Sequence, residues 1–315
     1  NKDKLRSSSF CNEYWMHFLE NEPIPSIDDE YEFMKQIVGM LPLEAINQTF
    51  AQAFPENNEN VVIISFNREK DDAVYPTSES LLGALAAART AEITAFVDNV
   101  KNEPLIAKMP KAGKVKKTEA NDKFGYKELT LSNGVKVIMK QTDFKKDQVV
   151  LTGQGDGGST LYGPADYVNC QVFDPLVDAS GLGGFSSTEL RKALAGKVAN
   201  ASLSLEERFT MVNGSSTPKD VETMLQLVYL YFTNITKDED AYKTLMSALE
   251  VQLKNRDINP QVAYSDSVQA TLYDNNPRYA PLTMNRLGEI SYDRILQMAK
   301  ERTASAKGWE FTIIG

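Results

Sequence analysis

The chain has 315 residues, of which 42% are hydrophobic and 24% charged, a composition typical of a folded globular protein. Its formal net charge of -9 argues against a broad nucleic-acid-binding surface, because neutralising phosphates requires clustered Lys and Arg. The sequence has no run of about 18 apolar residues, so no membrane-spanning helix is predicted.

This length favours two compact units, since a single hydrophobic core usually stops growing near about 250–300 residues. The first residues, Asn1 to Lys4, include neither a starting Met nor an apolar signal core. We therefore expect the chain to begin within a longer protein.

The single histidine restricts the metal chemistry, because peptidase zinc sites typically draw at least two imidazoles from one chain. His17 lies in an aromatic segment next to Trp15 and Phe18, which predicts a packed or half-exposed ring more than a metal ligand. Cys11 and Cys170 are far apart and form neither a metal knuckle nor a disulfide framework. We expect both thiols to be buried.

Three predicted helices and a strand open the chain. Apolar residues recur at helical spacing over 10–19, and a second helix is predicted to begin at Ser26, with Asp29 completing a capping box. A third helix is predicted over Leu43–Phe54, and the β-branched run Val61–Phe66 predicts a buried strand. Residues 1–70 therefore read as the C-terminal part of an α+β domain.

A connector follows over residues 71–124. Leucine and alanine periodicity predicts helix over 76–100, as one long helix or two short ones. Residues 101–124 lose this periodicity and contain two prolines and many lysines, which favours an extended linker. The lysines are also compatible with a binding patch, although a solvated tether is the simpler interpretation.

The second unit, 125–315, begins with a hairpin. Tyr126–Leu131 and Val135–Lys140 are β-prone runs on either side of Asn133-Gly134, which is the strongest short hairpin signal. A further strand is predicted over Gln148–Thr152.

Helices and strands then alternate. A capping box of Ser186 and Glu189 marks one helix start. Helices are predicted over 164–179, 186–197, 217–232, 238–256, onward to 273, and 291–304, and strands over 201–205, 209–212 and 309–314. This order predicts an α+β fold in which an antiparallel sheet is covered by helices.

A Gly-x-Gly-x-x-Gly match at Gly153, Gly155 and Gly158 follows a strand and precedes a helix, as in a dinucleotide site. Such a site also needs a second parallel strand soon after the helix, and the sequence continues into another helix instead. A tightly turning strand exit is therefore favoured. Gly-x-Ser-x-Gly and phosphate-loop motifs are absent from the sequence.

The segment Gly163–Cys170, GPADYVNC, carries a more specific resemblance. Together with the hairpin LSNGVKVIMK and the later SGLGGFSSTELRKALAGK, it resembles the start of an insulinase/pitrilysin domain, a metallopeptidase/mitochondrial-processing-peptidase-like fold. Active members of this family carry His-x-x-Glu-His on the corresponding helix. Residues at i and i+4 share a helix face and can hold one zinc, while the acid at i+3 acts as general base.

All three motif positions differ in this sequence. The histidine positions fall on Asp166 and Cys170, and the glutamate position falls on Asn169, which cannot accept a proton from water. Glu250 is a counterpart of the family's third ligand or, more simply, a surface helix carboxylate. We therefore predict no catalytic, cofactor-binding or metal-binding residue in this chain.

The resemblance extends to the first unit, where FLENEPIPSIDDEYEFMKQIVGMLPLEAINQTF is similar to the end of the family's second domain. The family resemblance implies four homologous domains in two halves that close around a peptide, with zinc in the first domain only. This chain then corresponds to a non-catalytic segment of a zinc endopeptidase, with zinc in the missing N-terminal domain. The implied partners are a peptide or unfolded polypeptide and the catalytic half of the same chain, and family habit favours a bacterial periplasm or cell envelope.

Two alternatives remain open at this point. The first is a catalytically dead scaffold or partner-binding module of the same fold. The second is a self-sufficient metalloenzyme that uses Asp166, Cys170 and Glu250, since Asp and Cys can each ligate zinc.

Overall fold

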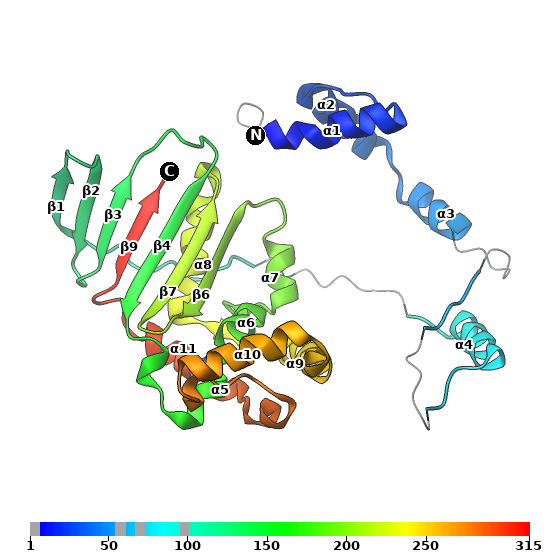
Figure 1. The fold of residues 1–315 in the computed structure, drawn as a ribbon. Coiled ribbons are helices and arrows are strands. Elements are labelled where there is room, and N and C mark those ends of the chain that lie inside the picture. Colours follow the sequence, from blue (N-terminus) through cyan, green and yellow to red (C-terminus); the bar gives the residue numbers. More distant parts are fainter. Residues whose placement is uncertain (1–6, 54–60, 67–72, 95–100, 102) are drawn as a thin grey trace. The chain divides into compact units, whose positions relative to one another are not determined.

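A computed structural model of the chain describes residues 7–53, 61–66, 73–94, 101 and 103–315 (Figure 1). Contacts between Cα atoms divide the chain into two units, Asn1–Asp98 and Asn99–Gly315. This division lies within the segment 71–124 for which the sequence predicts a connector helix and a linker.

The regular secondary structure in the described part of the first unit is helical. It contains α1 (Ser7–Glu20), α2 (Ile27–Met40), α3 (Leu43–Ala53) and α4 (Ser78–Thr90). The predicted capping box is present, because the Ser26 hydroxyl accepts from the Asp29 amide at 3.2 Å and the Asp29 carboxylate accepts from the Ser26 amide at 3.3 Å. Two of the predicted helices extended beyond the described residues, to Phe54 and into 95–100.

The predicted strand Val61–Phe66 was wrong. These residues have no strand assignment, and a strand requires a neighbour for its backbone groups, which the described residues of this unit do not provide. No described side chain of residues 7–94 is buried, and Phe66 is 92% exposed. Cys11 is exposed too, contrary to expectation, because α1 buries none of its described residues.

The second unit contains a seven-stranded sheet in the order β1-β2-β3-β9-β4-β7-β6 (Figure 1). Its strands are β1 (Val115–Asn121), β2 (Tyr126–Leu131), β3 (Lys136–Lys140), β4 (Val149–Asp156), β6 (Ala199–Leu205), β7 (Phe209–Ser216) and β9 (Glu310–Ile314). Every neighbouring pair is antiparallel except β3 and β9. The α+β prediction is confirmed. The short strands β5 (Gly181–Leu182) and β8 (Ile235–Thr236) pair separately.

The hairpin prediction is confirmed at β2 and β3, where Gly134 adopts φ +88° in the turn, a conformation that suits glycine. The sequence did not predict β1, which lies inside the expected linker 101–124. Six of its seven residues are exposed and the seventh is half-buried, so no apolar alternation marks the strand. Pairing with β2 nevertheless satisfies the backbone groups on one side of this edge strand.

Helices and 3₁₀ turns make up the rest of the second unit. They are η1 (Ser159–Leu161), η2 (Pro164–Asp166), α5 (Tyr167–Gln171), α6 (Phe173–Ala179), α7 (Ser187–Ala193), η3 (Pro218–Asp220), α8 (Val221–Thr233), α9 (Glu239–Lys254), η4 (Arg256–Ile258), α10 (Pro260–Leu272), η5 (Pro277–Tyr279), η6 (Met284–Glu289) and α11 (Tyr292–Thr303). The capping box of Ser186 and Glu189 is present at the start of α7.

The helix predicted over 164–179 is divided into η2, α5 and α6. Pro175 lacks an amide hydrogen and its ring would clash with the carbonyl of Gln171, so a continuous helix cannot pass through it. A break at Val172 places Pro175 in the first turn of α6, where no intrahelical amide bond is needed.

The core lies between the sheet and helices α6, α8 and α11. Helices α6 and α8 pack against β6, α8 also packs against β7, and α11 packs against both helices. Phe173, Ile295 and Met298 are fully buried there, with Leu151 of β4 and Val212 of β7. None of the described helices is long and apolar enough to cross a membrane.

Candidate functional site

The segment GPADYVNC lies where α5 meets the first turn of α11. Asp166 ends η2 and is the N-cap residue of α5, while Asn169 and Cys170 lie within α5. Helix α5 contacts both α6 and α11. The three motif positions therefore share one short helical segment packed against α11.

Arg294 of α11 is bound to the carboxylate of Asp166. Its Nε donates to Oδ1 at 3.0 Å and its Nη2 donates to Oδ2 at 2.8 Å, with side chains only 28% and 16% exposed. Hydrogen bonds from Arg294 hold the pKa of Asp166 below its ordinary value, against the opposing effect of burial. Both carboxylate oxygens of Asp166, which a metal would need as ligands, therefore already accept hydrogen bonds from a cation.

The same guanidinium also binds Glu301. Arg294 Nη1 donates to Glu301 Oε1 at 2.9 Å, and the Tyr162 hydroxyl donates to the other oxygen of this carboxylate at 3.3 Å. The Tyr162 ring lies 5.6 Å from the guanidinium carbon. Burial is the main cause that raises the pKa of Tyr162 to about 12, so its hydroxyl stays protonated near neutral pH.

Asn169 is 3% exposed and uses its amide to join α5 to α11. Its Nδ2 donates to Asp166 Oδ1 at 3.3 Å, and its Oδ1 accepts from the Ser291 backbone amide at 2.9 Å. Ser291 is the N-cap residue of α11 and accepts from the Arg294 amide. The residue at the general-base position is therefore occupied in fixing the start of a helix.

Cys170 is half-buried at a small cavity of about 200 Å³ that Tyr167 and Arg278 also line. Burial, followed by the nearby Asp166 charge, raises the pKa of this thiol to about 11. Arg278 donates to the carbonyls of Ser159 and Tyr162 and lies 4.5 Å from the Tyr167 ring centre. A protonated thiol is a weak metal ligand and a weak nucleophile.

The other residues considered from sequence lie apart from this network. Glu250 of α9 is 45% exposed and paired with Lys254 at 2.6 Å. His17 is exposed on α1 of the first unit, where its Nδ1 lies 2.6 Å from the Glu22 carbonyl oxygen. Within the described part of the chain, no three His, Cys, Asp or Glu side chains are grouped to hold a metal.

The glycine motif has a packing role. A Cβ at Gly155 would overlap the Trp309 ring and a Cβ at Gly153 would overlap the Phe311 ring, while one at Gly158 would overlap the 206–207 backbone. Strand β4, which carries the first two glycines, pairs antiparallel with both of its neighbours. The arrangement therefore lacks the parallel strands of a dinucleotide-binding unit.

Sequence reasoning missed Arg294, Tyr162, Ser291 and Glu301, which complete the network around Asp166 and Asn169. Arg294 is 128 positions from Asp166. The helical periodicity of α11 does not distinguish Arg294 from the other charged residues of that helix. A long-range pairing of this kind leaves no local signal.

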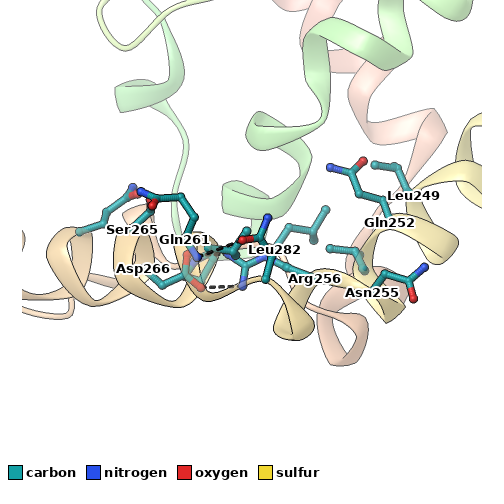
Figure 2. Close-up of a pocket in the computed structure, with 13 residues that line it drawn as sticks. Leu249, Gln252, Asn255, Arg256, Gln261, Ser265, Asp266 and Leu282 are labelled. Carbon is teal, nitrogen blue, oxygen red and sulfur yellow. Dashed lines mark hydrogen bonds and ion pairs between the residues drawn. The ribbon is translucent and has the colours of Figure 1, made fainter.

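A second feature is an open cavity of about 680 Å³ between α9 and α10 (Figure 2). Arg256 and Asp266 form a two-bond ion pair across it, with both distances at 2.6 Å. Several carboxamide side chains line its walls.

No known protein-family model matches the sequence. Over 292 residues the chain is 24% identical to an Arabidopsis thaliana protein described as zinc protease PQQL-like, a match that covers 92% of this chain and 28% of that protein. It is 19% identical over 297 residues to the probable zinc protease PqqL of Escherichia coli strain K12, covering 94% of this chain and 32% of that one.

Solved structures share the fold. The periplasmic protease PqqL from Escherichia coli has a TM-score of 0.60 and 17% identity, covering 99% of this chain and 34% of that structure. The ferredoxin protease FusC, in complex with Arabidopsis ferredoxin, has a TM-score of 0.60 and 15% identity, covering 98% of this chain and 34% of that one. The chain thus spans between 28% and 34% of the length of these relatives.

Proposed function

Because the chain belongs to the insulinase/pitrilysin-type zinc peptidase family, we propose that it is a non-catalytic segment of a longer metalloendopeptidase. In this proposal it contributes a chamber wall and a peptide-binding surface to a parent protein that hydrolyses peptide bonds. The hydrolysis itself takes place in another domain of the parent.

The observation that carries this proposal is the ion pair between Arg294 and Asp166. A zinc ion next to Asp166 would have to displace a guanidinium that this carboxylate already binds through both oxygens. Asn169 has no titratable group, and its amide oxygen already accepts from Ser291. These residues do not fit a zinc ion with an activated water, which supports a non-catalytic role for this segment.

Zinc is therefore assigned to the missing N-terminal domain of the parent. The relatives are described as zinc proteases, and the region that matches this chain makes up only 28% of one and 32% of the other. A parent of that size has room for a domain with an intact metal motif.

For the domains we propose that 1–70 is the C-terminal part of a preceding peptidase-like domain, that 71–124 contains the connector, and that 125–315 is the inactive domain. The many exposed large apolar side chains of the first unit support the first assignment, because such side chains normally pack against a sheet or a partner. The pairing of strand β1 with β2 supports counting residues 115–124 with this proposed domain as well.

For the substrate we propose a peptide or unfolded polypeptide, or a small protein of the kind bound by FusC, whose structure contains ferredoxin. For the location we propose the periplasm, because the PqqL structure is that of a periplasmic protease. The acidic net charge of -9 favours neither nucleic acid nor an anionic surface as a partner.

The proposal is tested by producing the catalytic half of the parent separately and adding the 315-residue chain to it. We expect peptide hydrolysis to require both pieces, with kcat/KM rising at least about tenfold on addition of the chain. Equal hydrolysis by the catalytic half alone would reject a substrate-binding role. A parent without His-x-x-Glu-His in any domain would instead support a catalytically dead scaffold.

A further inference from the structure

The cavity lies between α9 and α10, whose relative orientation is fixed by an ion pair. Arg256 follows α9, Asp266 lies in the middle of α10, and their two-bond ion pair is 18% and 30% exposed. Figure 2 shows this pair between the two helices. A bidentate pair of this kind fixes relative orientation, so the walls of the cavity are preorganised.

One wall carries a regular row of polar side chains. Gln261, Ser265 and Gln269 all line the cavity and are spaced four residues apart on α10. Successive members of the row are therefore about 6 Å apart along the helix axis. In an extended polypeptide, every second residue faces the same side, at a spacing of about 6.6 Å. The spacing of the polar row is therefore close to the repeat of an extended chain.

These side chains have hydrogen-bonding capacity to spare. Within the described part of the chain, Gln252, Gln261 and Ser265 make no side-chain hydrogen bond, and Gln269 donates only to the Tyr279 carbonyl, at 3.3 Å. A carboxamide offers two donors and an acceptor, which suits the alternating N–H and C=O groups of a peptide backbone.

The remaining lining is aliphatic and electrically balanced. Leu249 and Leu253 are four residues apart on α9, and Leu282 lies between the two helices. Among the described residues that line the cavity, Arg256 and Asp266 are the charged ones, and they form an ion pair with each other. A phosphate would need an uncompensated cation, and a metal would need grouped carboxylates, so neither matches this lining.

We propose that this cavity binds an extended, uncharged segment of polypeptide about four residues long, with its backbone on the Gln261–Ser265–Gln269 row and its side chains against the leucines. The inference rests on the proposed peptide-binding function and names one place where that binding occurs. Four extended residues cover about 13 Å, which matches the length of about 12 Å from Gln261 to Gln269.

The test measures fluorescence anisotropy of a labelled, unstructured peptide of Ala, Ser, Thr, Val and Gly titrated with the 315-residue chain. We expect the double variant Gln261→Ala/Ser265→Ala to raise Kd about tenfold, and Ser265→Trp, which fills the cavity, to abolish binding there. The matched control is Ser267→Ala/Thr271→Ala, since these hydroxyls also lie four residues apart on α10 but bond only to their own helix. We expect this control to leave Kd unchanged.

A second probe is the same peptide N-methylated at alternate residues, which removes backbone donors and keeps the side chains. We expect its Kd to rise about tenfold, because the polar row is proposed to accept hydrogen bonds from the peptide backbone amides. Binding that Ser265→Trp and N-methylation both leave unchanged would overturn the cavity proposal and leave the proposed function standing. No binding of the peptide by the unaltered chain would overturn both.

Discussion

The guanidinium of Arg294 binds both carboxylate oxygens of Asp166 across 128 residues of sequence, with Nη2 2.8 Å from Oδ2 and Nε 3.0 Å from Oδ1. The family resemblance of the sequence predicts a zinc ligand at the position of Asp166 in active members. In this chain the guanidinium of Arg294 is the cation next to Asp166. The fold can therefore hold α5 against α11 without a metal ion.

Replacing Arg294 by Met should destabilise the chain by about 2–3 kcal/mol. Asp166 is only 16% exposed and would keep its charge after losing the guanidinium, while Asn169 Nδ2 would still donate to it. Urea unfolding near neutral pH measures this change. The matched control is Lys254→Met, whose partner Glu250 is 2.6 Å away but 45% exposed, and we expect a change below about 0.5 kcal/mol. Equal effects of the two variants would contradict the assigned role of Arg294.

The pH dependence of stability should carry the signature of Asp166. Hydrogen bonds from Arg294 lower its pKa in the folded chain, so its contribution is present above the unfolded-state pKa of about 3.9 and is lost as pH falls through the lower folded value. We expect the unfolding free energy of the native chain to exceed that of Asp166→Asn near pH 7, and this difference to shrink below about pH 4. Urea titrations of both proteins at a series of pH values check this. A difference that grows on acidification would have the wrong sign.

Cys170 should react slowly with alkylating agents, because its pKa is raised to about 11 by burial and by the Asp166 charge. In a Cys11→Ser background at pH 8, we expect iodoacetamide to modify Cys170 at least about 100-fold more slowly in the folded chain than in urea. Mass spectrometry over time gives both rates. Rates within about threefold of each other would mean that the thiolate is accessible and that residual metal binding has to be reconsidered.

The glycines of β4 should matter for packing. A Cβ at Gly155 would overlap the buried Trp309 ring, so Gly155→Ala should cost about 1–3 kcal/mol in unfolding free energy. Gly163→Ala is the control, because no atom lies within 4 Å of the added Cβ and φ is -88°. Thermal and urea unfolding measure both variants. If Gly155→Ala were as stable as the control, the packing role would be wrong.

Local signals in the sequence predicted much of the fold. The capping boxes at Ser26 and Ser186 and the hairpin turn at Gly134 depend on residues within four positions of one another, and each formed as predicted. Features set by distant residues were missed. Strand β1 has no apolar alternation to reveal it, and the parallel pairing of β3 with β9 joins the two ends of the second unit.

The candidate site was predicted only in part. Motif spacing identified Asp166, Asn169 and Cys170, but it could not show which other side chains these residues bind. Arg294 reaches Asp166 because α5 and α11 pack together, and that packing depends on the whole core. The break at Val172 could have been predicted from Pro175, because in a continuous helix the proline ring would clash with the carbonyl of Gln171.

The central claim is that this segment cannot activate water for hydrolysis. The most direct measurement incubates the purified 315-residue chain with zinc and a fluorogenic unstructured peptide, with and without EDTA. We predict no cleavage above the buffer rate in either condition. Chelator-sensitive cleavage that Asp166→Ala or Cys170→Ser abolishes would contradict the account.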